Sequence, residues 1–92
     1  MKSAFELAME RLQKQAPTKT LTESQKAEIA DLESLYKSRI AQVEISIGDE
    51  IQSAQASEEF DKVDELKARL TQQKARLEEE REERKERVRQ GR

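Results

Sequence analysis

The fold is decided by a short stretch in the middle of the chain, Ala54-Gln55-Ala56-Ser57-Glu58-Glu59-Phe60. On both sides of it, apolar residues recur every three or four positions, which is the period of an α-helix, but within it this spacing lapses. Ser57 can cap a new helix, and the acids that follow suit the positive end of a helix dipole. We therefore predict a turn near residues 56–59 that joins two long helices within residues 22–90.

A single unbroken helix from Glu23 to Gln90 is the alternative, because the stretch contains neither Gly nor Pro. Such a rod would be roughly 100 Å long at 1.5 Å per residue. We favour the hairpin, in which the apolar stripe of one long helix covers that of the other. The predicted fold class is all-α, an antiparallel helical hairpin (a coiled coil) with a short N-terminal helix. Its intramolecular seam is predicted to contain Tyr36, Ile40, Val43, Ile47, Ile51, Phe60, Val63, Leu66, Leu70 and Leu77.

Residues 1–16 are predicted to form the short amphipathic helix, in which Phe5, Met9 and Leu12 share one face. A linker that contains the only proline of the chain follows over residues 17–21. Isolated helices shorter than about 12–15 residues are marginal in water, so this one is expected either to dock on another surface or to fray.

The second helix has two possible starts. The segment from Thr22 to Gln25 fits a capping box, in which a hydroxyl bonds the amide three residues on and a Gln or Glu side chain reaches back. The segment from Thr20 to Glu23 fits the same pattern. The start of the helix is therefore predicted to within two residues.

The open end of the predicted hairpin lacks an apolar cover. Residues 78–92 are almost all charged, so the third helix offers no apolar partner there to the start of the second helix. Either the N-terminal helix folds back over this end or a second molecule covers it. The candidate partner or oligomer interface consists of Phe5, Met9, Leu12, Ile29 and Leu32.

The composition suits a narrow seam better than a broad core. The 92 residues are 41% charged and 34% apolar, whereas an ordinary domain has roughly 25% charged and 45–50% apolar residues. Disorder is the competing interpretation of so much charge, but a sustained periodic stripe argues against it. Residues 23–60 carry nine acids and three bases, whereas residues 74–92 carry eight bases and six acids. Two such arms attract each other side by side, within one chain or between two.

The chain contains no Cys and no His. Disulfides, Cys-based metal sites, the usual zinc ligand and the commonest general base are therefore excluded. Because a narrow seam encloses no pocket, we predict no catalytic residues, no cofactor and no metal site, and hence not an enzyme. No apolar run approaches the roughly 20 residues of a membrane span, and charges interrupt the first residues, where a signal peptide would be apolar. A cytoplasmic protein that does not bind membranes is expected.

The function that fits best is a non-catalytic protein–protein interaction or scaffold module. We expect it to self-associate through helical packing, with a dimer favoured, although binding to a different protein as an adaptor remains open. The alternative is a nucleic-acid-associated accessory protein that uses its basic C-terminal helix. Glutamates interleave with the bases there and cancel the basic face, so nucleic acid is the weaker interpretation. The candidate contacts would be Arg84, Lys85, Arg87, Arg89 and Arg92.

One stretch of the predicted hairpin follows the pattern of a known family. An apolar residue and an alanine precede the turn, and a Phe then opens the second helix, at the positions Ile51, Ala54, Phe60, Val63, Leu66, Lys67 and Leu70. In this, residues 51–70 resemble the UVR motif, a small antiparallel helical hairpin of the UvrB and UvrC excision-repair proteins and of some bacterial chaperone and kinase-regulator proteins. The chain departs from the family at Glu58, Ala68 and Gln73. The resemblance implies the turn more than it implies a role in repair.

A second resemblance concerns the start of the chain. The segment from Lys2 to Leu12 is similar to the opening of a group of small bacterial coiled-coil proteins. This resemblance implies a bacterial source and carries no activity with it.

Overall fold

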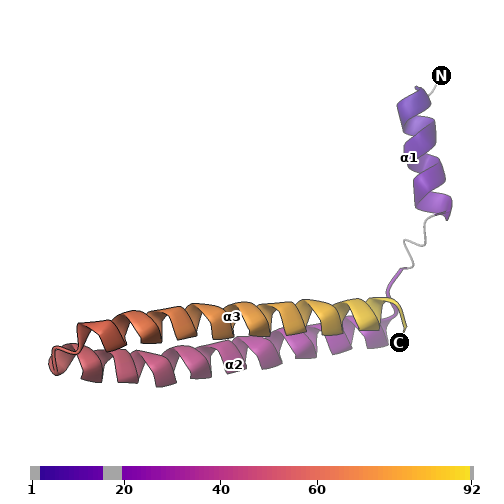
Figure 1. Ribbon diagram of the computed structural model, residues 1–92. Helices are drawn as coiled ribbons and strands as arrows, with labels where there is room; N and C mark the ends of the chain where they lie inside the picture. The colour runs from indigo at the N-terminus through magenta and orange to yellow at the C-terminus, as the bar shows by residue number, and fades with distance from the viewer. Residues whose placement is uncertain (1–2, 16–19, 92) are drawn as a thin grey trace.

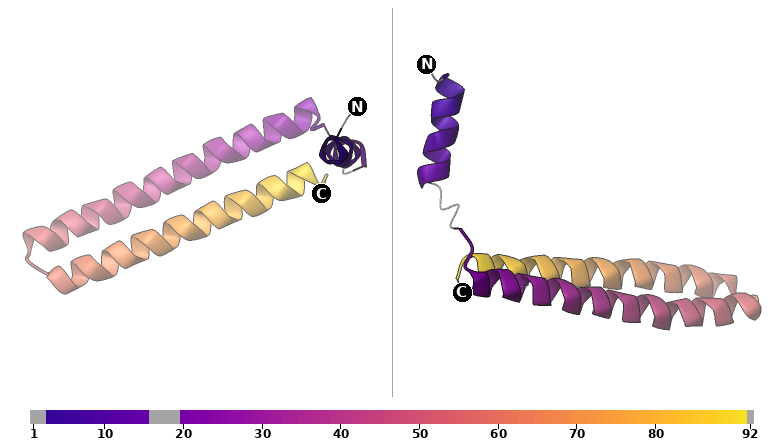
Figure 2. Two further views of the ribbon diagram at one scale, coloured as in Figure 1. Left: turned by 90° about the horizontal axis from the view of Figure 1, so that it is seen from above. Right: turned by 180° about the vertical axis from the view of Figure 1, so that it is seen from behind.

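The computed structural model describes residues 3–15 and 20–91, and for residues 10–15 it describes the backbone alone. It contains three helices, α1 (Ala4–Gln15), α2 (Glu23–Ala56) and α3 (Phe60–Arg89). Helices α2 and α3 lie antiparallel and side by side, as Figures 1 and 2 show. The predicted all-α hairpin is confirmed, and the single unbroken helix is excluded.

The turn between α2 and α3 is a Schellman motif, a helix end closed by two backbone hydrogen bonds. The Glu59 N–H donates to the Ala54 carbonyl oxygen over 2.9 Å, and the Glu58 N–H donates to that of Gln55 over 3.1 Å. Glu58 takes the left-handed conformation that this motif requires, with φ of 59°. Helix α3 is followed by the same conformation at Gly91, with φ of 73°, where a glycine adopts it without steric cost.

Ser57 has a different role from the one predicted. It is the C-cap of α2, and α3 begins at Phe60 after Glu59, which makes no side-chain capping bond. The reason is that the Schellman motif reverses the chain one residue after Ser57. The Ser57 hydroxyl therefore lies at the end of α2 rather than at the start of α3.

We expect Glu58→Gly to raise the free energy of unfolding by about 0.5–1 kcal/mol, because the left-handed conformation crowds the Cβ atom of any other residue. Urea unfolding followed by circular dichroism would measure the change. Glu58→Ala is the matched control, since it removes the carboxylate from the negative end of α2 but keeps the Cβ atom. A Gly variant no more stable than the Ala variant would contradict this account of the turn.

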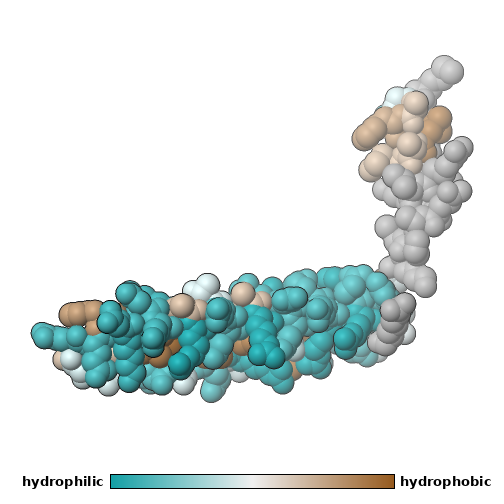
Figure 3. Space-filling model, in the orientation of Figure 1, coloured by the Kyte–Doolittle hydropathy of each residue, from teal (hydrophilic) through white to brown (hydrophobic). Residues whose placement is uncertain are grey.

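The core lies along the contact between α2 and α3 and is most apolar near the turn. There Ile47, Ala54, Val63 and Leu66 form one buried cluster, with Val43, Ile51 and Leu70 packed against it. Of the other predicted seam residues, Tyr36 is buried, and Ile40 and Leu77 are half-buried. The outer surface of the hairpin is largely hydrophilic in Figure 3, as expected for a seam only one stripe wide.

Phe60 lies outside the seam, which corrects the prediction. Its side chain is 64% exposed although it follows the helical spacing of Val63 and Leu66. Phe60 is the first residue of α3, directly after the turn, where α2 has ended and no longer covers it. Periodicity identifies the face of a helix, but it does not show where the facing helix stops.

Helix α1 stands apart from the hairpin in Figures 1 and 2. Its described residues make no contact with α2 or α3. Its N-terminus is capped by Ser3, whose Oγ accepts the Glu6 N–H over 3.2 Å. None of the helices in the described part of the chain has a stretch long and apolar enough to cross a membrane.

Candidate functional site

At the open end of the hairpin, α2 begins with a capping box. Of the two possible starts, the structure uses the one at Thr22. The Thr22 Oγ1 accepts the Gln25 N–H over 3.0 Å, and the Gln25 Oε1 accepts the Thr22 N–H over 2.9 Å. The same Gln25 side chain donates from Nε2 to the Val88 carbonyl oxygen over 2.9 Å. One residue therefore begins α2 and ties it to the end of α3.

Tyr36 forms a polar layer between the two helices, in which its ring is buried and its charged partners lie at or near the surface. Its side chain is 1% exposed, and its hydroxyl accepts a 3.2 Å hydrogen bond from Arg84 Nη1. The hydroxyl also lies 3.5 Å from a carboxylate oxygen of Glu80. The guanidinium carbons of Arg39 and Arg84 lie 5.1 and 5.7 Å from the ring centroid, which is cation–π distance. This layer gives a buried hydroxyl its partners and sets the local register of the hairpin.

Ion pairs cross between the acidic and basic arms. The Lys85 Nζ lies 2.8 Å from the Glu33 Oε1, and the Lys74 Nζ lies 3.5 Å from the Glu44 Oε1. The Lys85 side chain is only 12% exposed, whereas that of Glu33 is 56% exposed, so the pair is shielded from water on the Lys85 side alone. The hydrogen bond from Lys85, and then its charge, hold the pKa of the Glu33 carboxyl below its ordinary value.

We expect this ion pair to make the stability of the hairpin depend on pH in the acid range. Because the pKa of Glu33 is lower in the folded chain than in the unfolded chain, its contribution is fully present above the ordinary Glu pKa. The contribution is lost as the pH falls through the lowered value. The difference in free energy of unfolding between wild type and Glu33→Gln should therefore shrink from neutral pH toward acid.

Urea unfolding at a series of pH values would measure this difference. Lys85→Met keeps the aliphatic stem and removes the same pair from α3, so it should flatten the pH dependence as Glu33→Gln does. A difference between wild type and Glu33→Gln that stays constant from neutral to acid pH would contradict the role of the pair.

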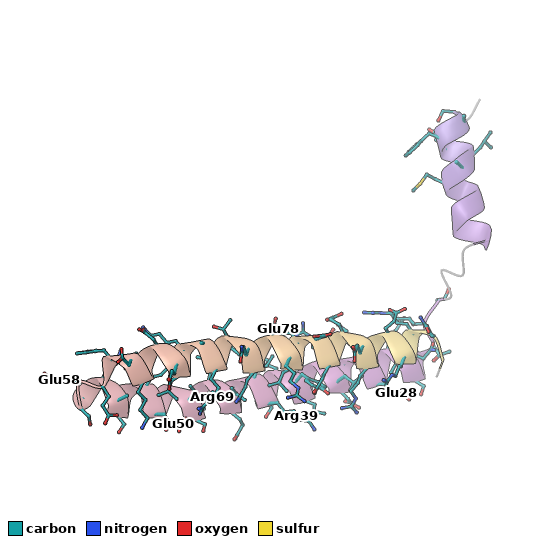
Figure 4. The ribbon with its side chains drawn as sticks, viewed as in Figure 1. Glu28, Arg39, Glu50, Glu58, Arg69 and Glu78 are labelled. Atoms are coloured by element: carbon teal, nitrogen blue, oxygen red, sulfur yellow. The ribbon has the colours of Figure 1, made fainter. Side chains whose placement is uncertain are left out.

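An open groove of about 440 Å³ lies beside this polar layer, at the open end. Its floor is apolar, and its walls differ in charge, because the acids come from α2 and the bases from α3. We call it the open-end groove; it is lined by Glu28, Asp31, Leu32, Leu35, Arg84, Arg87 and Val88. Figure 4 shows Glu28 near this end of the hairpin, whereas Arg69 lies closer to the turn.

The structure covers the start of α2 better than the sequence suggests. Leu32 is only 9% exposed and Ile29 is half-buried, whereas both were expected to lack a cover. The third helix runs on to Arg89 and brings Val88 and the long stems of its charged residues over this end. Sequence reasoning missed Leu35 and Val88, although Leu35 follows Leu32 at helical spacing and Val88 is the one apolar residue within 78–92.

The N-terminal half of the predicted interface is exposed. Phe5 is 73% exposed and Met9 is 44% exposed. Figure 3 shows that much of the surface of α1 that is coloured there is hydrophobic. The side chain of Leu12 lies outside the described residues. The structure therefore does not bring α1 and the start of α2 together within one chain.

Most of the candidate nucleic-acid contacts that the structure describes serve the hairpin itself. Arg84 bonds Tyr36, Lys85 pairs with Glu33, and Arg89 Nη1 lies 3.2 Å from a carboxylate oxygen of Glu86. The fourth, Arg87, lines the open-end groove, and Arg92 falls outside the described residues. No contact in this arrangement favours the nucleic-acid interpretation.

Within the described residues, no group of three or more acids is arranged to hold a metal ion.

Comparisons of the chain with protein-family models, with curated proteins and with solved structures found no match in any of the three. The resemblance of residues 51–70 to the UVR motif stays a prediction.

Proposed function

We propose that the chain is a non-catalytic protein–protein interaction module that self-associates through α1. The observation that carries the proposal is the exposed apolar face of this helix. Phe5 and Met9 are held in a helix of 12 residues that contacts neither α2 nor α3 in the described part of the chain. A helix of that length is marginal in water, so packing of this face on another molecule would stabilise it.

The hairpin supports this role as a rigid carrier. Its own seam is closed by the buried cluster near the turn and by the Tyr36 layer toward the open end. It therefore needs no further subunit to bury its main apolar stripe. The absence of His and Cys from the sequence and the open form of the groove support a module that binds rather than catalyses.

Sedimentation equilibrium of the full chain over a range of concentrations tests the proposal. The mass is expected to rise above the 10.7 kDa of one chain as the concentration increases. Phe5→Glu should shift the chain toward the monomer, because it places a charge on the apolar face of α1. Phe60→Glu is the matched control, since Phe60 is an exposed phenylalanine at the opposite end of the hairpin.

Two results would contradict the proposal. A wild-type chain that keeps the mass of one chain at every concentration would show that it does not self-associate. Equal shifts toward the monomer in the Phe5→Glu and Phe60→Glu variants would show that the chain does not associate through α1.

A further inference from the structure

We infer that the open-end groove is the receptor for α1 of a second copy, so that two chains associate by exchanging their N-terminal helices. This inference rests on the proposed self-association and adds where on the partner the helix binds and in which direction. It follows from the apolar floor of the groove, from the opposite charges of its walls and from the position of Glu6 on α1.

The groove has the features of a seat for one amphipathic helix. Leu32, Leu35 and Val88 supply an apolar floor, and Leu35 is among the exposed large apolar residues of the hairpin. The groove extends over residues 28–35 of α2, which is about 12 Å at 1.5 Å per residue, whereas α1 is about 18 Å long. Helix α1 is therefore long enough to cover the floor along its whole length.

The walls make the groove directional. Glu28 and Asp31 of α2 line one side, and Arg84 and Arg87 of α3 line the other. A helix with an acid beside its apolar stripe fits such a groove in one direction only. In the opposite direction the acid would face the acidic wall, and like charges in contact are unfavourable.

The order of residues around the helices gives that direction. Seen from the N-terminus of a right-handed helix, successive residues advance clockwise by about 100°. On α2, the groove residues therefore lie anticlockwise of Leu32 and Tyr36, which face α3. On α1, Glu6 lies clockwise of the stripe formed by Phe5 and Met9. An α1 running parallel to α2 would turn Glu6 toward the acids of α2, and an antiparallel α1 turns it toward the bases of α3.

A second copy supplies α1 in this antiparallel direction. Because α1 precedes α2 in the chain, its C-terminal end leads into the open end of its own hairpin (Figure 1). If two hairpins meet open end to open end, each α1 reaches the groove of the other hairpin and runs antiparallel to the α2 that it meets. Each chain offers one helix and one groove, so the exchange is complete in a two-fold dimer.

The alternative occupant is the chain's own α1, folded back over the open end. In the structure α1 stands apart from its own hairpin and makes no contact with it in the described residues. Within the described residues of one chain, the exposed face of α1 and the open groove are thus both left without a partner. A second copy supplies the partner for both at once.

The test is a charge exchange between two variants of the full chain. In Glu6→Arg, an Arg at position 6 would face the basic wall of an identical chain, which includes Arg87. In Arg87→Glu, Glu6 would face a wall in which one base has become an acid. Each variant alone should self-associate at least about tenfold more weakly than wild type, since like charges then face each other at both contacts of the dimer. Sedimentation equilibrium measures the dissociation constants.

An equimolar mixture of the two variants should associate as wild type does. In the mixed dimer, the Arg at position 6 faces a wall that carries Glu at position 87, and Glu6 of the other chain faces the unchanged basic wall. Glu6→Arg mixed with Arg69→Glu is the matched control. Arg69 is an exposed arginine of α3 that lies away from the open end (Figure 4). Arg69→Glu should therefore associate with itself as wild type does, and its mixed dimer with Glu6→Arg should stay weaker, because the Arg at position 6 still faces the unchanged basic wall.

The outcomes separate this inference from the proposed function. Recovery in the mixture alone supports exchange between two chains at this groove. Two weakened variants that do not recover on mixing would show that position 6 does not face the wall of position 87 in another chain, and would overturn the inference. If each variant associates as strongly as wild type, the groove is not the binding site of α1, although the proposed self-association stands. If the wild-type chain is a monomer, both the groove inference and the proposed self-association are wrong.

Discussion

Replacing Tyr36 with Ala is expected to lower the free energy of unfolding by about 3–5 kcal/mol, the usual cost of truncating a buried aromatic residue. The ring is 1% exposed and lies between α2 and α3. Its removal would leave a cavity and would also deprive Arg84 of a hydrogen-bond acceptor and a stacking surface. Urea or thermal unfolding followed by circular dichroism would measure the loss.

Tyr36→Phe separates the ring from the hydroxyl. It keeps the packing and the stacked guanidinium groups, and it removes the oxygen that Arg84 and Glu80 contact. A loss of about 1 kcal/mol is expected, as for a typical net hydrogen bond. A Phe variant as unstable as the Ala variant would show that the polar contacts, and not the ring, hold this part of the hairpin together.

Leu66→Ala should cost about 2–5 kcal/mol, because Leu66 is buried in the apolar cluster near the turn. Ile45→Ala is the control, since it truncates an aliphatic side chain of similar size that is exposed on α2. The control should change the free energy of unfolding by less than about 0.5 kcal/mol. Similar losses in the two variants, compared by urea unfolding, would mean that the buried face is assigned to the wrong side of the helices.

The hairpin was predictable because its two signals are local. Apolar spacing that lapses between Ala54 and Phe60 locates the turn, and the capping box at Thr22 locates the start of α2 to within two residues. The turn itself was harder to predict, because Glu58 takes a conformation that its side chain disfavours. A glycine there would have marked the Schellman motif, and without it Ser57 resembled a cap for the next helix.

The open end was poorly predicted because polar side chains build it. Periodicity counts apolar residues, so it overlooked the bond from Gln25 to α3 and the contact between Tyr36 and Arg84. The sequence also presented Lys85 only as a candidate nucleic-acid contact, although this side chain bonds Glu33 of α2. These contacts depend on how far long side chains reach between helices, which sequence spacing does not describe.

The exposed residues of α1 were predicted as a face, but their partner was not. Phe5 and Met9 share a side of the helix, as their spacing indicates, and the sequence left open whether that side packs within the chain or between chains. The structure leaves the face exposed and α1 without contact to its own hairpin in the described residues. The open-end groove could not be foreseen, because Leu35 and Val88 come together only when α2 and α3 pair.

The most direct test of self-association through α1 is hydrogen exchange of the N-terminal helix at different concentrations of the full chain. A helix of 12 residues that folds on a second copy should exchange its backbone amides freely in dilute solution and become protected as the concentration rises. Mass spectrometry of the peptide that covers residues 1–15 reports this protection, and Phe5→Glu should abolish it. Protection that is the same at every concentration, whether high or absent, would contradict the account.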